Sequence, residues 1–321
     1  GFSSTYYNQG SLNNKGVEFS LNAQIIDSSS WKWSVSGNIG VNRNEISDLG
    51  LLPADFGCLG ERVGYYGNSL GDHFGVGHIF LAGEAPGLFY GYVTQGIVQK
   101  EDITENGIKY IKQDGSVGYY QTVNKTTPVA GDVKYVDRNG DGVVDDNDRD
   151  IIGNPNPDFT YGFQTKVSWK SLSLSASFNG VQGRDILNVG NRYNNTPGTK
   201  SNNVTRKAFQ NMWTDENPSN LYPKSTFVVQ NMVMDRYVED GSYLRCSDIT
   251  LSYVLPAKWT NKIGIKNTSV YASVKNAFVI TDYSGYDPEV NSFAFDGLRP
   301  GVDMNSYPTP RSFVFGLNLT F

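Results

Sequence analysis

Hydrophobic and polar residues alternate one by one over long stretches of this chain. Between positions 17 and 25 the odd residues are apolar and the even ones are polar, as in VEFSLNAQI. A short DSSS turn follows, and the alternation resumes from Trp31 to Val41. Because successive side chains of a strand point to opposite faces of a sheet, a period of two indicates one apolar and one polar face. We therefore predict a hairpin over residues 17–41.

The same pattern predicts a second hairpin and several further strands. The second hairpin covers residues 159–178, with a tight turn around Lys170 and Ser171. The further strands are predicted at Leu88–Gln99, Thr226–Val238, Ser242–Leu255, Ser269–Ile280 and Phe313–Phe321. Several of these run for about ten residues, whereas strands of globular proteins average about 5–6. A strand of about ten residues spans a bilayer at a tilt.

The connections between strands are of two kinds. Tight turns alternate with long polar segments rich in Gly, Asn, Asp and Pro, which are Gly50–Asp72, Lys100–Asp132, Leu187–Ser225 and Ser284–Tyr307. Aromatic residues gather near strand ends, with Trp31, Trp33 and Trp169 as the clearest cases. Short turns at one end, long loops at the other and aromatic girdles are typical of an outer-membrane barrel.

Two architectures fit this alternation. The apolar faces could pack together in a β-sandwich, or they could meet lipid in a barrel. Strand length and the terminal aromatic Phe321 favour the barrel. The pattern gives nine to eleven strands, and an open sheet leaves unpaired backbone groups in lipid. The fold class we predict is therefore an all-β, antiparallel transmembrane β-barrel, to which residues 1–321 contribute about the last ten strands. The abrupt start at Gly1 indicates that the first part lies upstream.

Composition narrows the classes of function. The chain has 321 residues, a formal net charge of −5 and 18% charged residues. Soluble domains average about 25% charged residues. An acidic chain lacks the basic face that a nucleic-acid partner needs. No run of 18 apolar residues occurs, so no membrane-spanning helix is expected.

The residues of common catalytic sites are scarce. The chain has two histidines, His73 and His78, to which we assign a loop role, and two cysteines, Cys58 and Cys246, which we expect to be unpaired. No G-x-S-x-G, H-E-x-x-H or P-loop motif occurs. Asp287 and Glu289 form a carboxylate pair in YDPEVN, but a sequence does not show whether they face a cleft. We therefore expect that this protein is not an enzyme.

The sharpest local motif is DRNGDGVVDDND, from Asp137 to Asp148. It matches D-x-N-x-D-G with an acidic residue at the twelfth place. Hard oxygen ligands at this spacing suit Ca²⁺. The predicted ligands are Asp137, Asn139, Asp141, Val143 through its carbonyl, Asp145 and Asp148. No helical pattern flanks the loop, and Asp148 stands where an EF-hand has Glu. The alternative is an acidic, solvated turn.

Several blocks resemble the C-terminal part of the SusC/RagA-type TonB-dependent outer-membrane transporters. These blocks follow one another through nearly the whole chain and are NKGVEFSLNAQII, WKWSVSGNIGVNRNEIS, GDVKYVDRNGDGVVDDNDRDIIGNPNPDFTYGF, DRYVEDGSYLRCSDITLSYVLP, NAFVITDYSGYDPEVN and RSFVFGLNLTF. The resemblance implies a 22-stranded barrel in the outer membrane of a Gram-negative bacterium. It also implies a plug domain and a TonB box upstream of Gly1, and it makes Phe321 a terminal signal for barrel assembly.

The function implied by this resemblance is TonB-dependent import of oligosaccharides or peptides. The implied partners are TonB and a SusD-like surface lipoprotein that acts as a lid. Two alternatives remain open, a passive porin and a calcium-stapled surface β-sandwich that binds glycans. For a transporter, the alternation predicts a water-filled lumen lined by polar residues, namely Glu18, Asn22, Gln24, Asn38, Asn42, Gln164 and Lys166.

Overall fold

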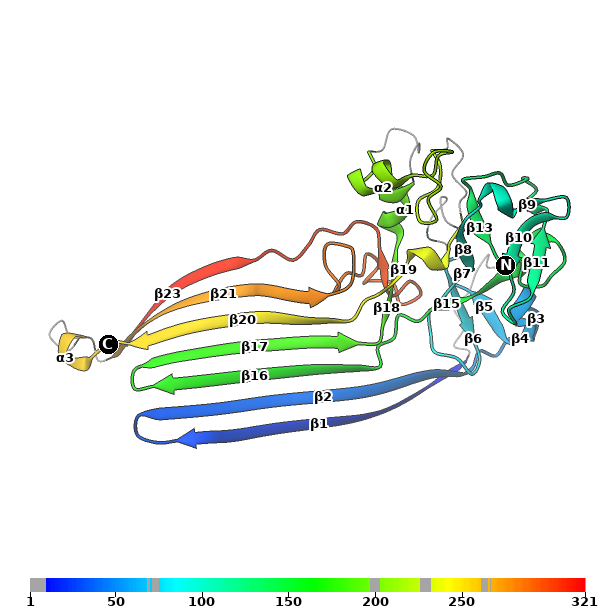
Figure 1. Cartoon of the computed structure of the whole chain (residues 1–321). Coiled ribbons are helices and arrows are strands. Elements are labelled where there is room, and N and C mark those ends of the chain that lie inside the picture. Colours follow the sequence, from blue (N-terminus) through cyan, green and yellow to red (C-terminus); the bar gives the residue numbers. More distant parts are fainter. Residues whose placement is uncertain are drawn as a thin grey trace, which may run out of the picture.

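One long antiparallel sheet dominates the computed structural model, which describes residues 10–67, 70, 75–196, 203–225, 232–260, 265 and 267–320. We call this sheet the wall, and its strand order is β1-β2-β16-β17-β20-β21-β23. The strands run side by side, with the short turns at one end (Figure 1). Their bounds are β1 (Ser11–Asp27), β2 (Trp31–Asp48), β16 (Phe159–Trp169), β17 (Leu172–Gln182), β20 (Tyr243–Val254), β21 (Asn267–Thr281) and β23 (Ser312–Thr320).

The long connections fold into short elements at the other end of the wall (Figure 1). We call residues 49–158, 183–242 and 282–311 the loop layer. Its strands are β3 (Ala54–Asp55), β4 (Glu61–Arg62), β5 (Gly64–Tyr66), β6 (His78–Leu81), β7 (Leu88–Tyr92), β8 (Thr94–Ile97), β9 (Ile103–Thr104), β10 (Gly107–Ile111), β11 (Val117–Tyr120), β12 (Thr122–Val123), β13 (Val133–Tyr135), β14 (Val143–Val144), β15 (Arg149–Gly153), β18 (Asp185–Asn188), β19 (Val238–Asp240) and β22 (Val302–Asp303).

Short helices complete the described chain. The α-helices are α1 (Val189–Asn195), α2 (Arg206–Asn211) and α3 (Ala257–Thr260), and the 3₁₀ turns are η1 (Gly57–Leu59), η2 (Lys100–Asp102), η3 (Asp146–Asp148) and η4 (Asp235–Tyr237). Helix α3 lies at the turn end of the wall, while α1 and α2 belong to the loop layer (Figure 1). Among the residues that the structure describes, no helix is both long and apolar enough to cross a membrane.

The buried apolar core lies in the loop layer and not in the wall. The largest buried cluster includes Phe89, Tyr92, Tyr120 and Tyr135. Two smaller clusters form around Tyr90 and around Tyr283. None of the three clusters, as far as the chain is described, contains a residue of the seven wall strands. The described wall therefore buries few of its apolar side chains, with Ile46, Tyr243 and Cys246 as the exceptions.

The strand register places apolar residues on one face of the wall and polar residues on the other. Phe19 pairs with Ile39, and Ile39 pairs with Tyr161. Further along, Leu174 lies between Val167 and Leu251. Since directly paired residues share a face, the apolar positions form rows across the sheet. The polar positions form the opposite face.

A bulge preserves this separation where the sequence alternation slips. Cys246 and Asp248 are two residues apart and would share a face in a regular strand. Instead, Cys246 pairs with Phe178 and Asp248 pairs with Ser177, so Ser247 is an extra residue. The partner strand β21 bulges at the same place, where Asn276 adopts a φ of 51°. The bulge turns Asp248 to the polar face.

The structure confirms both predicted hairpins, the strands at 242–255 and 269–280, and most of the last one. The long strand predicted at 88–99 is wrong, because this segment forms two short strands of the loop layer, the buried β7 and the mostly half-buried β8. The described part of 226–238 is also not a long strand, because residues 235–237 form η4. Within the residues that the structure describes, the wall thus has seven strands, fewer than the predicted ten or so. Phe321 lies outside the described residues.

The structure describes three of the four histidines and cysteines. His78 is fully buried in β6, where its Nε2 lies 3.0 Å from the carbonyl oxygen of Pro300, so the loop role predicted for it is wrong. His73 lies outside the described residues. Cys58 and Cys246 are both unpaired, as expected.

Candidate functional site

The polar face of the wall carries rows of amide, hydroxyl and charged side chains. One row runs Asn22, Ser36, Gln164, Ser177, Asp248 and Lys275, one residue from each of six neighbouring strands. The seven residues predicted to line a lumen all belong to this face by register. Six of them line two hollows on it, with Asn22, Gln24, Gln164 and Lys166 in one and Glu18 and Asn42 in the other. The structure therefore brings the predicted polar residues together on one surface.

One ion pair on this face is held by a hydrogen-bonded cluster. Lys275 Nζ lies 2.7 Å from Asp248 Oδ2. Ser273 donates to Asp248 Oδ2 at 2.7 Å and Thr250 donates to Asp248 Oδ1 at 2.8 Å. The bulge in β20 and β21 brings these residues together. Sequence alternation does not reveal them, because it does not show the bulge.

The apolar face of the wall is exposed. Phe315 is 79% exposed, Val17 73% and Phe313 67%. The same holds in the middle of the sheet, where Phe163 and Leu174 are nearly half exposed. A β-sandwich would bury these side chains against a second sheet, so the sandwich alternative is not supported. An exposed apolar face of this extent needs an apolar environment outside the chain.

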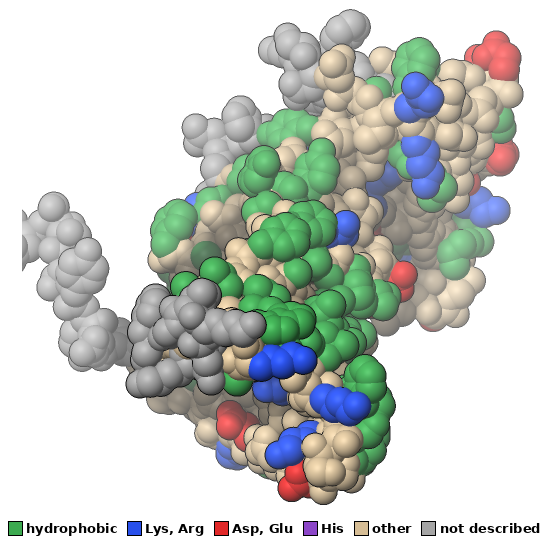
Figure 2. Space-filling model, turned by 90° about the vertical axis from the view of Figure 1, so that its left-hand side faces the viewer, with side chains coloured by type: hydrophobic (Ala, Val, Ile, Leu, Met, Phe, Trp, Pro, Cys, Tyr) green, Lys and Arg blue, Asp and Glu red, His purple; other side chains and the backbone are tan. Residues whose placement is uncertain are grey.

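Aromatic and basic residues gather at the turn end of the wall. Trp31 and Trp169 lie with ring centroids 6.0 Å apart, and Lys170 Nζ lies 5.2 Å from the Trp169 ring centre. Viewed from this end, hydrophobic side chains cover much of the surface, with Lys and Arg among them (Figure 2). Tryptophan and lysine at strand ends suit the boundary between hydrocarbon and water, because each has an apolar body and a polar tip.

In the Asp137–Asp148 loop, the Asp137 side chain organises the first turn. It is buried, and its two oxygens accept from the backbone N–H of Gly140 at 2.6 Å and of Gly142 at 2.8 Å. Gly140 and Gly142 have φ values of 79° and 87°, which a residue with a side chain rarely adopts. The glycines of the motif are therefore required by the backbone itself.

Asp148 closes the same loop from its other end. It is fully buried and accepts backbone hydrogen bonds from Arg138 at 2.7 Å, Asn139 at 3.1 Å and Asp145 at 2.8 Å. These bonds favour the ionised form, but burial outweighs them and raises the pKa of Asp148 to about 6. The nearby Asp137 carboxylate adds to the rise.

The remaining predicted ligands lie at the surface of the loop. Asn139, Asp141 and Val143 are exposed, and Asp145 is half-buried. Asp141 accepts from Val143 N at 2.8 Å and from Asn139 Nδ2 at 3.1 Å. Within the described chain, no three acidic, histidine or cysteine side chains converge. The donors are of the hard oxygen type that Ca²⁺ takes, while the loop's own amides hold the oxygens.

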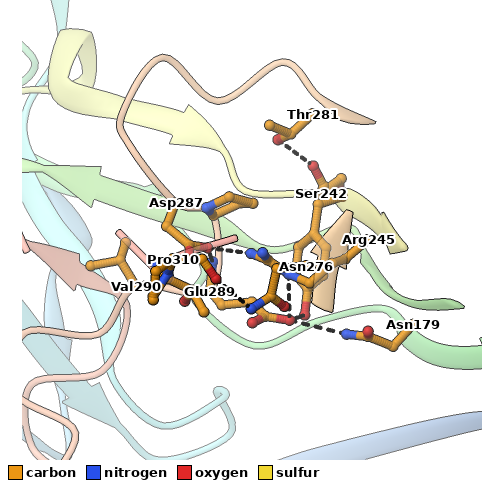
Figure 3. Close-up of polar contacts among 12 residues, drawn as sticks. Asn179, Ser242, Arg245, Asn276, Thr281, Asp287, Glu289, Val290 and Pro310 are labelled. Atoms are coloured by element: carbon orange, nitrogen blue, oxygen red, sulfur yellow. Dashed lines mark hydrogen bonds and ion pairs between the residues drawn. The ribbon is translucent and has the colours of Figure 1, made fainter. Parts of the chain in front are cut away.

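A buried ionic cluster joins the loop layer to the wall. Sequence patterns indicated only its two carboxylates, in YDPEVN. Arg245 of β20 is 5% exposed and pairs with Asp287. Its Nε lies 3.4 Å from Glu289 Oε1, which also accepts from Tyr243 at 2.7 Å and Asn179 at 3.0 Å. Asn179 of β17, Arg245 of β20 and Glu289 of the 282–311 connection point toward one another (Figure 3). Asp287 and Glu289 therefore bind Arg245, and they do not stand apart as an acid and a base would.

Comparison with known proteins finds relatives along the whole chain. TonB-dependent receptor P26 of Formosa agariphila is 31% identical over 330 residues, covering 100% of this chain and 30% of that protein. TonB-dependent receptor SusC of Bacteroides thetaiotaomicron is 32% identical over 323 residues, covering 98% of this chain and 27% of that protein. No family model matches the chain.

A solved structure shares the fold. The structure of the RagAB peptide transporter matches 100% of this chain with a TM-score of 0.69 and 26% identity, over 30% of its own chain. A long antiparallel wall with one exposed apolar face and one polar face defines an outer-membrane β-barrel protein. The chain belongs to the TonB-dependent receptors and is of the SusC/RagA type. It spans about 30% of the length of these relatives.

Proposed function

We propose that this chain forms part of the barrel of an importer in the outer membrane of a Gram-negative bacterium, which takes up oligosaccharides or peptides. The observation that carries this proposal is the two-faced wall. Its apolar face is exposed over all seven strands, and its polar face holds rows of amide and hydroxyl groups. The first face suits lipid and the second suits a water-filled lumen.

The proposed lumen is lined by Glu18, Asn22, Gln24, Asn38, Asn42, Gln164 and Lys166. Their position on one face supports this, because the opposite face offers no comparable set of polar side chains. The loop layer then lies at the outer mouth of the barrel, since long loops of such barrels face outward and short turns face the periplasm.

The proposed energy source is TonB, which would act through a part of the protein that this chain does not include. The proposed partner at the mouth is a SusD-like surface lipoprotein. Similarity to SusC and to the RagAB transporter supports both proposals. No catalytic role is proposed, because the carboxylates Asp287 and Glu289 are bound to Arg245.

Uptake measured with and without TonB tests the proposal. Cells that express the full-length protein are given a radiolabelled nutrient, and uptake is compared between a wild-type and a tonB-deleted background. We expect uptake to be lost without TonB. Uptake that continues unchanged would instead support the passive porin alternative, since a porin needs no energy source.

We also propose that the Asp137–Asp148 loop binds Ca²⁺ as a structural staple. Two observations support this proposal. The first is the spacing of oxygen ligands from Asp137 to Asp148. The second is that Asp137 and Asp148 are both buried and that burial, together with the nearby Asp137, raises the pKa of Asp148, a cost that a cation would offset. Calorimetric titration of the purified protein with Ca²⁺ after chelation tests it, and the absence of saturable binding would contradict it.

A further inference from the structure

One row of directly paired residues crosses six wall strands close to their short turns. Each member pairs with the next, and the row consists of Trp31, Trp169, Leu172, Tyr253, Val270 and Leu317. All six side chains are between 37% and 57% exposed on the apolar face. Tryptophan and tyrosine rings prefer the boundary between hydrocarbon and water. Because short turns face the periplasm, this row marks the edge of the hydrocarbon on the periplasmic side.

Lys170 follows the row by one residue and is held by the neighbouring turns. It is the first of the two residues that connect β16 to β17, and its φ is 51°. Its backbone N–H donates to the carbonyl oxygen of Ser30 at 2.8 Å, and Val254 N–H donates to the carbonyl oxygen of Ser171 at 2.9 Å. Both neighbouring strands therefore support the turn that carries Lys170.

The side chain of Lys170 lies on the lipid-facing side of this turn. Its Nζ lies 5.2 Å from the ring centre of Trp169, and the Trp169 and Trp31 rings are 6.0 Å apart. A strand advances about 3.3 Å per residue, so the ammonium lies just beyond the aromatic row, at the depth of lipid headgroups. An ammonium has three N–H groups, so contact with one ring leaves donors for a ligand outside the chain.

Positive charge exceeds negative charge at the turn end. The described segments 27–32, 169–172 and 254–260 contain three lysines and one acidic residue. That acid, Asp27, has its Oδ1 3.6 Å from Lys32 Nζ. These segments hold no further carboxylate for Lys170 or for Lys258, both of which are exposed. This part of the surface therefore suits a negatively charged ligand.

We propose that Lys170, held over Trp169 and beside Trp31, binds the phosphate of an anionic phospholipid such as phosphatidylglycerol in the periplasmic leaflet. This inference rests on the membrane location in the proposed function. The ammonium donates to phosphate oxygens, and the two indole rings pack against the glycerol and the first acyl carbons. A zwitterionic lipid has a cation of its own beside its phosphate, so an excess of lysine favours an anionic lipid.

Lipid retention by purified full-length protein tests this inference. Native mass spectrometry of the protein in micelles, with equal amounts of dioleoyl phosphatidylglycerol and dioleoyl phosphatidylcholine, measures which lipid stays bound. We expect the wild type to favour phosphatidylglycerol. Lys170→Asn removes the charge but tolerates the positive φ, and it should lower this preference about fivefold. Lys170→Arg keeps the charge and should keep the preference.

A matched control and the import assay complete the test. Lys109→Asn removes an exposed lysine from β10 in the loop layer and should change nothing. Equal retention of the two lipids by the wild type, or a wild-type preference in Lys170→Asn, overturns the inference. Either result together with TonB-dependent uptake leaves the import function intact. Retention of phosphatidylglycerol through Lys170 without TonB-dependent uptake supports the lipid site and overturns active import.

Discussion

Asp137 and Asp148 show how single side chains shape the loop layer. Each is buried, and together they accept five hydrogen bonds from backbone N–H groups. A buried backbone N–H without a partner costs about 1–3 kcal/mol, so these carboxylates have a structural role with or without a cation. The exposed ligand Asp141 is therefore the better residue for a test of calcium binding.

Asp141→Asn is expected to weaken Ca²⁺ binding by about tenfold or more, because the number of charged ligands sets affinity in such loops. The loop should keep its shape in chelator, since Asn can still accept from Val143 N. The matched control is Asp146→Asn, whose carboxylate binds Tyr92 and Arg149 and is not a predicted ligand. Calorimetry that gives the two variants the same affinity would contradict the ligand assignment.

The raised pKa of Asp148 predicts that the stability of the Asp137–Asp148 loop depends on pH. Burial raises its pKa from 3.8 to about 6 in the folded loop. The folded loop thus holds this proton more tightly than the unfolded chain, so its stabilising contribution is complete below pH 3.8 and is lost as pH rises through about 6. In chelator, hydrogen exchange corrected for intrinsic rates should show less protection of residues 137–148 at pH 7.5 than at pH 5. Asp148→Asn should remove the difference, and equal protection in the wild type would refute this.

Among the elements, the long wall strands and the short loop-layer strands differ in what they bury. The wall strands have 9–18 residues and few buried apolar side chains, while the loop-layer strands have 2–5 residues and hold the core. The Arg245 cluster connects the two. Because breaking a buried ion pair leaves a charge without its partner, it costs about 3–5 kcal/mol.

Arg245→Met is therefore expected to release the 282–311 segment while the barrel stays folded. Limited proteolysis should cut this segment faster, and heat-modifiable gel mobility should report an intact barrel. Lys275→Met is the matched control, because the Lys275 side chain is 52% exposed and its ion pair with Asp248 makes no contact with the 282–311 segment. Equal cleavage rates in the two variants would mean that Arg245 does not hold the segment.

The wall could be predicted from the sequence because its signal is local. Alternation over residues 17–41 and 159–178 sets both strand and face, and the structure keeps both. The segment 88–99 was misassigned because a continuous apolar run has no period that separates a short buried strand from a long wall strand. The Arg245–Asp287 contact joins residues 42 positions apart, and no local pattern encodes it.

At the scale of the whole molecule, the two faces of the wall decide where the protein can reside. Phe315 is 79% exposed on the apolar face, and Asn318 of the same strand is on the other. A charge on a lipid-facing strand costs about 2–4 kcal/mol near the bilayer centre. Phe315→Arg should therefore reduce the amount of assembled barrel in membranes, whereas Asn318→Arg should not. Equal assembly of the two variants would argue against lipid on the apolar face.

The most direct test of the account measures which face meets lipid. Spin labels are placed singly at positions 313, 314, 315, 317, 318 and 319 of the full-length protein in bilayers, with Cys58 and Cys246 replaced by Ser. Position 316 is left out because the ring of Tyr271 lies where a side chain at Gly316 would be. Collision with oxygen, which enters lipid, is compared with collision with a water-soluble nickel complex. We predict alternation, with oxygen favoured at 313, 315, 317 and 319 and nickel at 314 and 318. Odd positions shielded from both reagents, or open to nickel like the even ones, would contradict it.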